Sequence, residues 1–283
     1  MQSLWMIVAS FFFAGMGVCV KLASARYSAA EIVFYRALIN LLFIWALVRA
    51  RGISVRTPLW VFHIRRSASG CFSLILYFYA ISLLPLATAV TLSYTSPLFL
   101  ALYLAVLGKA RLRGGMAFAL ALGFAGVVLL LHPTFRADQL FGGVMGLASG
   151  MVSAVAYFNI KELGERGELE ERIVFYFALV CTVVGAVWML FFEFHPIDAE
   201  GGALLLGVGL FGSAAQLAMT RAYKQGNTLM AASLAYTTVV FASLFGAIFW
   251  HEILSVDAWL AIALIVASGV VATWFSRADP GVG

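Results

Sequence analysis

The sequence predicts an all-α membrane protein of ten transmembrane helices, arranged as two inverted repeats of five helices each. Composition is the first reason: of 283 residues, 63% are hydrophobic and 11% are charged, whereas soluble proteins carry about 25% charged residues. Ten long runs with few or no charges are the second. The third is an internal duplication, in which residues 89–107 recur as residues 231–249.

Each apolar run has about the length that a helix needs to cross roughly 30 Å of hydrocarbon. The first run has no basic segment before it and no A-x-A site after it, so we expect a retained helix and not a signal peptide. No charge separates the third run from the fourth, but Pro85 marks a turn between them. The ten predicted spans are residues 4–20, 32–48, 67–84, 89–107, 114–131, 140–160, 173–192, 201–220, 229–250 and 258–276.

Lysine and arginine positions predict the orientation. With the N-terminus in the cytoplasm, the outside receives only Lys21, Arg26 and Arg136, and Arg36 falls within a span. This asymmetry predicts cytoplasmic termini, as in a bacterial inner membrane. It also accounts for the net charge of +5 without a nucleic-acid partner. The residues predicted inside are Arg49, Arg51, Arg56, Arg65, Arg66, Lys109, Arg111, Arg113, Lys161, Arg166, Arg172, Arg221, Lys224 and Arg277.

The duplication divides the chain into a first repeat, residues 1–135, and a second, residues 136–283. Residues 89–107 and 231–249 align without gaps with seven of nineteen positions identical, and residues 32–37 (IVFYRA) recur as 173–178 (IVFYFA). Five spans per repeat is an odd number, so the second repeat enters the membrane from the opposite side. Such repeats are related by a pseudo-twofold axis in the membrane plane.

These features resemble the drug/metabolite transporter superfamily of the EamA type. The resemblance rests on the ten helices in two halves, Arg36 within Phe-Tyr-Arg-Ala and the Pro-Leu-Ala-Thr-Ala-Val turn at residues 85–90. It covers the chain from about Leu4 to Phe275, and it implies a secondary transporter working by alternating access. Val239 stands where Pro97 stands in the first copy, which leaves open whether both fourth helices kink.

Polar stripes at helical spacing provide the candidate binding residues, since no constellation of an enzyme is visible. Tyr94 and Tyr236 occupy equivalent positions on either side of the midplane, where a transporter's substrate site is expected. The alternative for the serines and threonines is a bond within their own helix or between helices, without substrate contact. The predicted substrate-binding residues are Tyr94, Tyr236, Gln216, Tyr157, Thr95, Thr237, Ser213 and Tyr79.

Arg36 is the only basic residue that falls well inside a predicted span. A charge at that depth has a function or extends to the membrane surface, and the family resemblance favours a gating or structural charge over substrate contact. Without a deep pair of basic residues, phosphorylated sugars are not expected as substrates. No carboxylate lies at mid-membrane, which predicts an uncoupled facilitator or exchanger, unless coupling uses His251 and Glu252.

The predicted function is therefore the export or exchange of a small organic metabolite such as an amino acid, by alternating access around a central cavity. Alternatives are transport of a vitamin such as riboflavin or of S-adenosylmethionine, or a lipid-handling or accessory membrane protein. The predicted partners are a small-molecule substrate and the lipid bilayer, in a monomer or homodimer. No enzymatic activity, cofactor or metal is expected.

Overall fold

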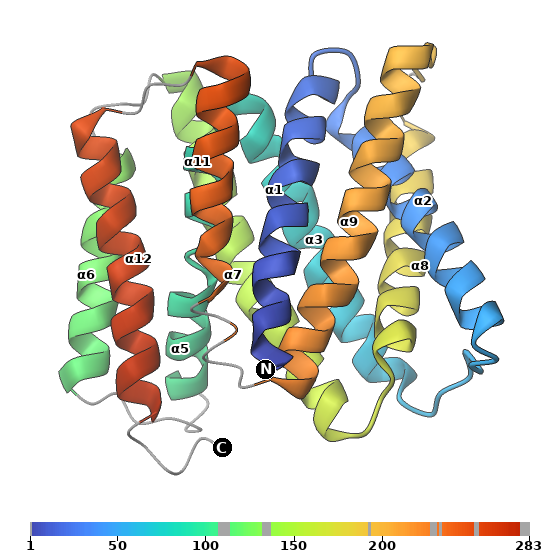
Figure 1. The fold of residues 1–283 in the computed structure, drawn as a ribbon, viewed down its shortest axis with the longest axis horizontal. Helices are drawn as coiled ribbons and strands as arrows, with labels where there is room; N and C mark the ends of the chain where they lie inside the picture. The colour runs from blue at the N-terminus through green and yellow to red at the C-terminus, as the bar shows by residue number, and fades with distance from the viewer. Residues whose placement is uncertain are drawn as a thin grey trace.

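The computed structural model describes residues 2–106, 114–131, 137–191, 194–226, 231, 234–251 and 255–277. These residues form helices joined by short loops, with no strand among them (Figure 1). The first half of the chain contains η1 (Gln2–Leu4), α1 (Trp5–Ala23), α2 (Ala29–Ala50), α3 (Trp60–Leu83), α4 (Leu86–Ser93), α5 (Ser96–Val106) and α6 (Gly114–Leu131). The second half contains α7 (Ala137–Glu165), α8 (Glu170–Met189), α9 (Ala199–Gln225), α11 (Thr237–Trp250) and α12 (Val256–Arg277).

The predicted all-α fold is confirmed, because each of the ten predicted spans contains a helix. The fourth span is divided into α4 and α5, and α11 of the ninth span begins only at Thr237. Several helices run beyond the predicted limits. The largest extension is at α3, which begins at Trp60 and not at residue 67. Four predicted loop residues, Lys109, Arg111, Arg113 and Arg136, and the alternative coupling residue Glu252 lie outside the described residues.

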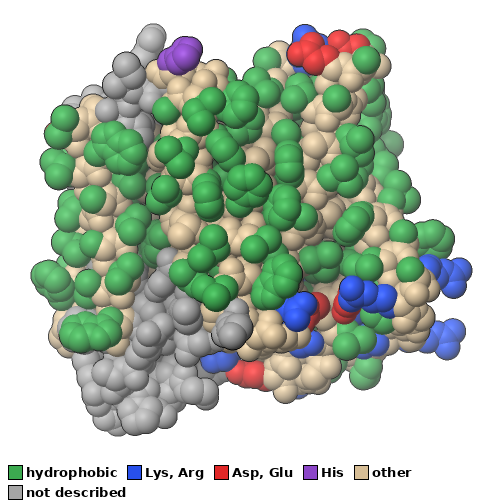
Figure 2. Space-filling view, in the orientation of Figure 1, with side chains coloured by type: hydrophobic (Ala, Val, Ile, Leu, Met, Phe, Trp, Pro, Cys, Tyr) green, Lys and Arg blue, Asp and Glu red, His purple; other side chains and the backbone are tan. Residues whose placement is uncertain are grey.

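The outer surface of the bundle is apolar, as an integral membrane protein requires. Five helices are long and apolar enough by themselves to cross a membrane: α1 with η1, α2, most of α7, α8 and α9. Large hydrophobic side chains such as Trp45, Phe72 and Val187 are exposed. Figure 2 shows such side chains over the middle of one face, while most Lys and Arg lie at the lower edge, where α1 begins and α12 ends.

Helices of the two halves pack against each other in pairs. Of the helices in the first half, α1 packs on α9 of the second half, α2 on α8, α3 on α7, and α4 on α11. The fifth pair, α6 and α12, lies side by side at one edge of the bundle (Figure 1). Because every pair joins the two halves, any space left between the paired helices is bounded by both.

The fourth helix of each half is interrupted at its tyrosine. Tyr94 separates α4 from α5, and α11 begins directly after Tyr236. At both interruptions the next residue, a threonine, donates its hydroxyl to the carbonyl three residues earlier, at 2.6 Å for Thr95 and 2.7 Å for Thr237. Such bonds compete with regular helical pairing. The second copy breaks without a proline, so Pro97 alone does not cause the interruption.

Candidate functional site

A cavity with several polar groups in a largely apolar wall lies between the two halves, in the middle of the helix pairs. Its walls come from α1, α2, α3 and the end of α4 in the first half, and from α7, α8 and α9 in the second. The cavity has a volume of about 80 Å³. A cavity between helices that is lined by few but converging polar groups is the usual form of a small-molecule site.

Two arginines, Arg36 of α2 and Arg66 of α3, line this cavity. Their exposed fractions are 1% and 2%. Arg36 Nε donates to Met16 Sδ at 3.4 Å, and among the described residues Arg36 Nη1 and Arg66 Nε and Nη1 have no hydrogen-bond partner. The Phe177 ring lies beside both guanidinium groups, with its centroid 5.6 Å from Arg36 Cζ and 4.1 Å from Arg66 Cζ. Among the described residues, no aspartate or glutamate lines the cavity.

The place of Arg66 corrects two expectations from the sequence. Arg66 was expected in a cytoplasmic loop, and the protein was expected to lack a deep pair of basic residues. Instead α3 begins six residues before Arg66 and carries it into the bundle. The signal that would have located it is helical spacing: Arg66, Gly70, Ser73 and Tyr77 follow one another at steps of four, three and four, and all four line the cavity.

Two glycines provide the space for these guanidinium groups. A Cβ atom at Gly70, one turn after Arg66, would lie 2.2 Å from Arg66 Nη1 and 3.0 Å from the Phe177 ring. A Cβ atom at Gly212 of α9 would lie 3.1 Å from Arg36 Nε and 3.1 Å from Met16 Sδ. Each guanidinium group therefore packs against a glycine, where any larger residue would place a Cβ atom in its way.

Four serines connect three of the helices around the cavity. Ser73 Oγ lies 2.5 Å from Ser153 Oγ and donates to the carbonyl of Ser149 at 3.0 Å, which joins α3 to α7. Ser149 Oγ donates to Ser93 Oγ at 2.9 Å, which joins α7 to α4. Because their hydroxyls are paired with one another, these serines hold the cavity wall together. Ser73, Ser93 and Ser153 also line the cavity, and Ser149 connects them from behind the wall.

Three of the predicted substrate-binding residues line the cavity: Tyr94, Tyr157 and Gln216. The Tyr157 ring stacks on Tyr223, with 4.9 Å between centroids and 17° between planes. Gln216 Nε2 is buried and has no hydrogen-bond partner in the part of the chain that the structure describes. The structure thus brings together Tyr94 from the break between α4 and α5, Tyr157 from α7 and Gln216 from α9.

The other five predicted residues do not line the cavity: Tyr236, Thr95, Thr237, Ser213 and Tyr79. Ser213 donates its hydroxyl to the carbonyl of Gly209 at 2.7 Å, and the two threonines bond their own helices at the interruptions described above. These bonds lie within single helices, which was the alternative to substrate contact that the sequence left open for serine and threonine. The Tyr79 ring stacks on Trp188 at 6.3 Å, and Tyr236 is buried outside the cavity wall.

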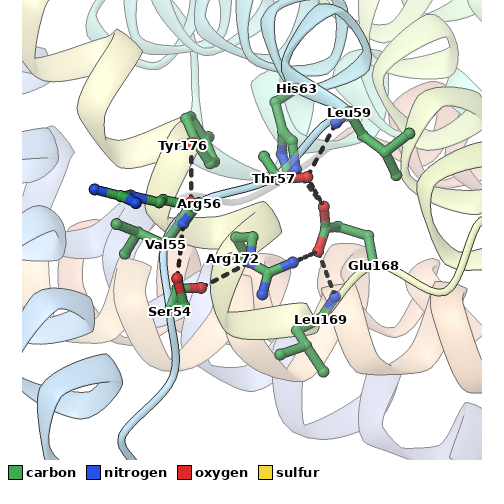
Figure 3. A network of polar contacts seen from close by, with 10 residues as sticks. All are labelled: Ser54, Val55, Arg56, Thr57, Leu59, His63, Glu168, Leu169, Arg172 and Tyr176. Atoms are coloured by element: carbon green, nitrogen blue, oxygen red, sulfur yellow. Dashed lines mark hydrogen bonds and ion pairs between the residues drawn. The ribbon is translucent and has the colours of Figure 1, made fainter.

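A polar cluster joins the two halves at the lower end of the bundle (Figure 3). Its centre is Glu168, between α7 and α8, whose carboxylate accepts from Thr57 at 2.5 Å, lies 3.0 Å from His63 Nε2 and pairs with Arg172. Burial disfavours ionisation of this carboxyl, but the bonds from Thr57, His63 and the Leu169 N–H and the charge of Arg172 outweigh it and hold the pKa of Glu168 below its ordinary value.

A second polar cluster joins the halves at the upper end. Arg26, in the loop between α1 and α2, pairs with Asp198 at 2.8 Å and with Glu200 at 2.7 Å. Nearby, the Glu31 carboxylate accepts from the His195 N–H at 2.7 Å and lies 2.9 Å from His195 Nδ1. At both ends, therefore, a buried glutamate of one half contacts a histidine of the other.

Comparison with known proteins shows which family has this arrangement. The profile of the EamA-like transporter family matches residues 1–132 and 140–274. A solved crystal structure superposes with a TM-score of 0.73 over 98% of both chains at 23% identity, which shows the same fold.

Three curated relatives are named as transporters. The pseudopaline exporter CntI of Pseudomonas aeruginosa is 33% identical over 94% of this chain and 90% of that protein. The aromatic amino acid exporter YddG of Ancylobacter novellus is 29% identical over 82% of both chains. A riboflavin transporter of Brucella anthropi is 22% identical over 98% of both.

Proposed function

Because this chain belongs to the EamA-like transporter family, we propose that it exports or exchanges a small organic metabolite, such as an amino acid, by alternating access. The observation that carries this proposal is the cavity between the halves, whose wall is formed by residues of both. A site shared by two structural halves opens to either side of the membrane when one half moves against the other. The family and its relatives make the protein a transporter of small molecules and not an enzyme.

The two halves in this mechanism are the repeats 1–135 and 136–283, related by inversion. Support comes from the fourth helices, which break at Tyr94 and at Tyr236 and carry the same threonine bond after the break. Packing adds to it, because helices pair across the halves throughout the bundle. In this proposal the interrupted helices are the flexible elements on which the halves move.

The polar clusters at the two ends serve as the contacts that open and close. Each ties the start of a helix in the first half to a loop of the second: His63 of α3 contacts Glu168 at the lower end, and Glu31 of α2 contacts His195 at the upper end. A path from the cavity to either side requires the cluster at that end to separate. The lower end faces the cytoplasm of a bacterial inner membrane in this proposal, since Lys and Arg gather there (Figure 2).

Substrate contact falls to Tyr94, Tyr157 and Gln216 among the residues predicted from sequence. Aromatic rings and an unpaired amide suit a small metabolite with both polar and apolar parts. The names of the relatives, exporters of pseudopaline and of aromatic amino acids, are consistent with such a solute.

Transport by the purified protein alone tests the proposal. Proteoliposomes loaded with an unlabelled solute are expected to take up the same solute in labelled form from a panel of amino acids, riboflavin and S-adenosylmethionine. Tyr94→Ala should reduce uptake at least several-fold. Tyr236→Ala removes the equivalent ring outside the cavity and serves as the matched control. Absence of uptake across the panel, with the protein folded, would favour an accessory or lipid-handling role.

A further inference from the structure

We infer that the cavity binds a negatively charged group, so that the substrate is an organic anion whose carboxylate or phosphate contacts Arg36 and Arg66. The inference rests on the proposed function, because it names the class of substrate for the same cavity. It also revises two expectations from the sequence, that Arg36 is a gating or structural charge and that phosphorylated sugars are not substrates.

Charge is the first argument. An arginine side chain stays protonated in proteins, so the cavity wall carries two positive charges. In the part of the chain that the structure describes, no carboxylate lines the wall to balance them. The two buried glutamates of that part are engaged elsewhere, Glu168 in the lower cluster and Glu31 in the upper. Buried charges without a partner are unfavourable, and ionisable residues at membrane depth are retained for a function.

Geometry is the second argument. Both guanidinium groups lie beside the same ring, Phe177, and both present N–H groups that no described residue accepts from. Gly70 and Gly212 leave the space that these groups occupy. A guanidinium is a planar group with several donors, and it matches two oxygens of a carboxylate or phosphate at once.

The neutral groups of the wall provide the third argument. Gln216 Nε2 and the Tyr77 hydroxyl are also buried without a hydrogen-bond partner among the described residues, and both line the cavity. Each can donate to an oxygen of a bound anion. The described wall therefore offers unpaired donors from α2, α3 and α9 and no acidic acceptor. This arrangement favours an anion over a cation of the same size.

Ligands that differ only in charge test the inference. Binding to the purified protein is measured by calorimetry for glutamate, glutamine and lysine, and for glycerol 3-phosphate against glycerol. Arg36→Gln and Arg66→Gln are compared with Arg65→Gln. This control removes the same charge from the neighbouring residue, whose side chain is half exposed and lies 4.0 Å from Glu162. Arg66→Lys keeps the positive charge but lacks the planar guanidinium group. It serves as a further variant if the glutamine variants do not fold.

The expected result is that glutamate, glycerol 3-phosphate or both bind at least about ten-fold more tightly than their neutral counterparts. Arg36→Gln and Arg66→Gln should each remove this preference, Arg66→Lys should weaken it, and Arg65→Gln should keep it. The arm that responds identifies a carboxylate or a phosphate as the recognised group.

Two other results would overturn the inference in distinguishable ways. In the first result, glutamine or lysine binds as tightly as glutamate, glycerol binds as tightly as glycerol 3-phosphate, and the arginine variants bind like the wild type. The cavity would then be a transport site without anion recognition. If no compound of any charge binds, and none crosses in proteoliposomes, the proposed function fails together with the inference.

Discussion

The guanidinium carbon of Arg66 lies 4.1 Å from the centroid of the Phe177 ring, and that of Arg36 lies 5.6 Å from the same point. Phe177 occupies in residues 173–178 the place that Arg36 occupies in residues 32–37. Equivalent positions of the two copies thus supply a cation and an aromatic face to one site. A desolvated cation–π contact contributes about 2 kcal/mol, whereas burying an ion costs several. The ring alone does not offset the burial of both arginines, and a bound anion would.

Replacement of Arg66 by methionine should separate binding from stability. Methionine fills a similar volume without the buried charge, so the unliganded protein should be as stable as the wild type or more stable, by up to about 4 kcal/mol. Stabilisation by an anionic ligand should be lost. Melting temperatures in detergent, with and without glutamate or glycerol 3-phosphate, measure both effects. A large loss of stability in the unliganded variant would instead make Arg66 a structural residue.

Gly70→Ala should weaken anion binding without changing any charge. Its Cβ atom would lie 2.2 Å from Arg66 Nη1, so the guanidinium must move away from its place beside Phe177. We expect a loss of affinity of about ten-fold, while the helix itself gains up to about 1 kcal/mol from alanine. Gly15→Ala is the matched control, because its nearest neighbour is a Phe211 carbon at 3.7 Å. If the two variants bound the anion with equal affinity, the position proposed for the Arg66 guanidinium in the binding site would be contradicted.

The lower polar cluster should make the protein sensitive to acid. The pKa of Glu168 is lower in the folded protein than its ordinary value, so the ionised carboxylate stabilises the fold. This contribution is complete above the unfolded pKa, about 4.3, and is lost as the pH falls further, through the folded pKa. The wild type should therefore melt at a higher temperature than Glu168→Gln near pH 7, and the difference should shrink in acid. A constant difference down to pH 3 would show that ionisation of Glu168 is not the cause.

Substitution of Thr237 tests whether the threonine hydroxyls at the helix interruptions contact the substrate. Its side chain bonds the carbonyl of Leu234 and does not line the cavity. Thr237→Val should lower stability by about 0.5–1.5 kcal/mol, the net contribution of one hydrogen bond, and should leave ligand affinity unchanged. Thr237→Ser keeps the hydroxyl and should behave like the wild type. A selective loss of affinity in Thr237→Val would return this residue to the substrate site.

The sequence allowed the ten spans and the helical fold class to be predicted because hydropathy in a membrane is a local property. Length and charge within each run suffice, whichever helix the run later contacts. Prediction of the candidate site also required the spacing of polar residues along each helix. Tyr94, Tyr157 and Gln216 were found through polar spacing on their own helices, and all three line the cavity.

Arg66 was missed because a count of charges assigns every arginine at the edge of an apolar run to a loop. Its neighbour Arg65 does lie half exposed on the outer side of α3, while Arg66 turns inward one residue later. The two directions are told apart by the helical spacing of Arg66 with Gly70, Ser73 and Tyr77, but this spacing becomes visible only when α3 is known to begin before Arg66. Phe177 was not recognised either, because an aromatic residue in an apolar run carries no signal until its neighbours are known.

The most direct test of the central claim is the accessibility of the cavity from both sides of the membrane. Ser153→Cys places a thiol of nearly the same shape in the cavity wall, in a protein whose three cysteines, Cys19, Cys71 and Cys181, have been replaced. An impermeant thiol reagent is applied to right-side-out and to inverted vesicles. Alternating access predicts labelling in both preparations, slowed by a transported solute. Labelling from one side only, unaffected by any solute, would contradict a transport site shared by the two halves.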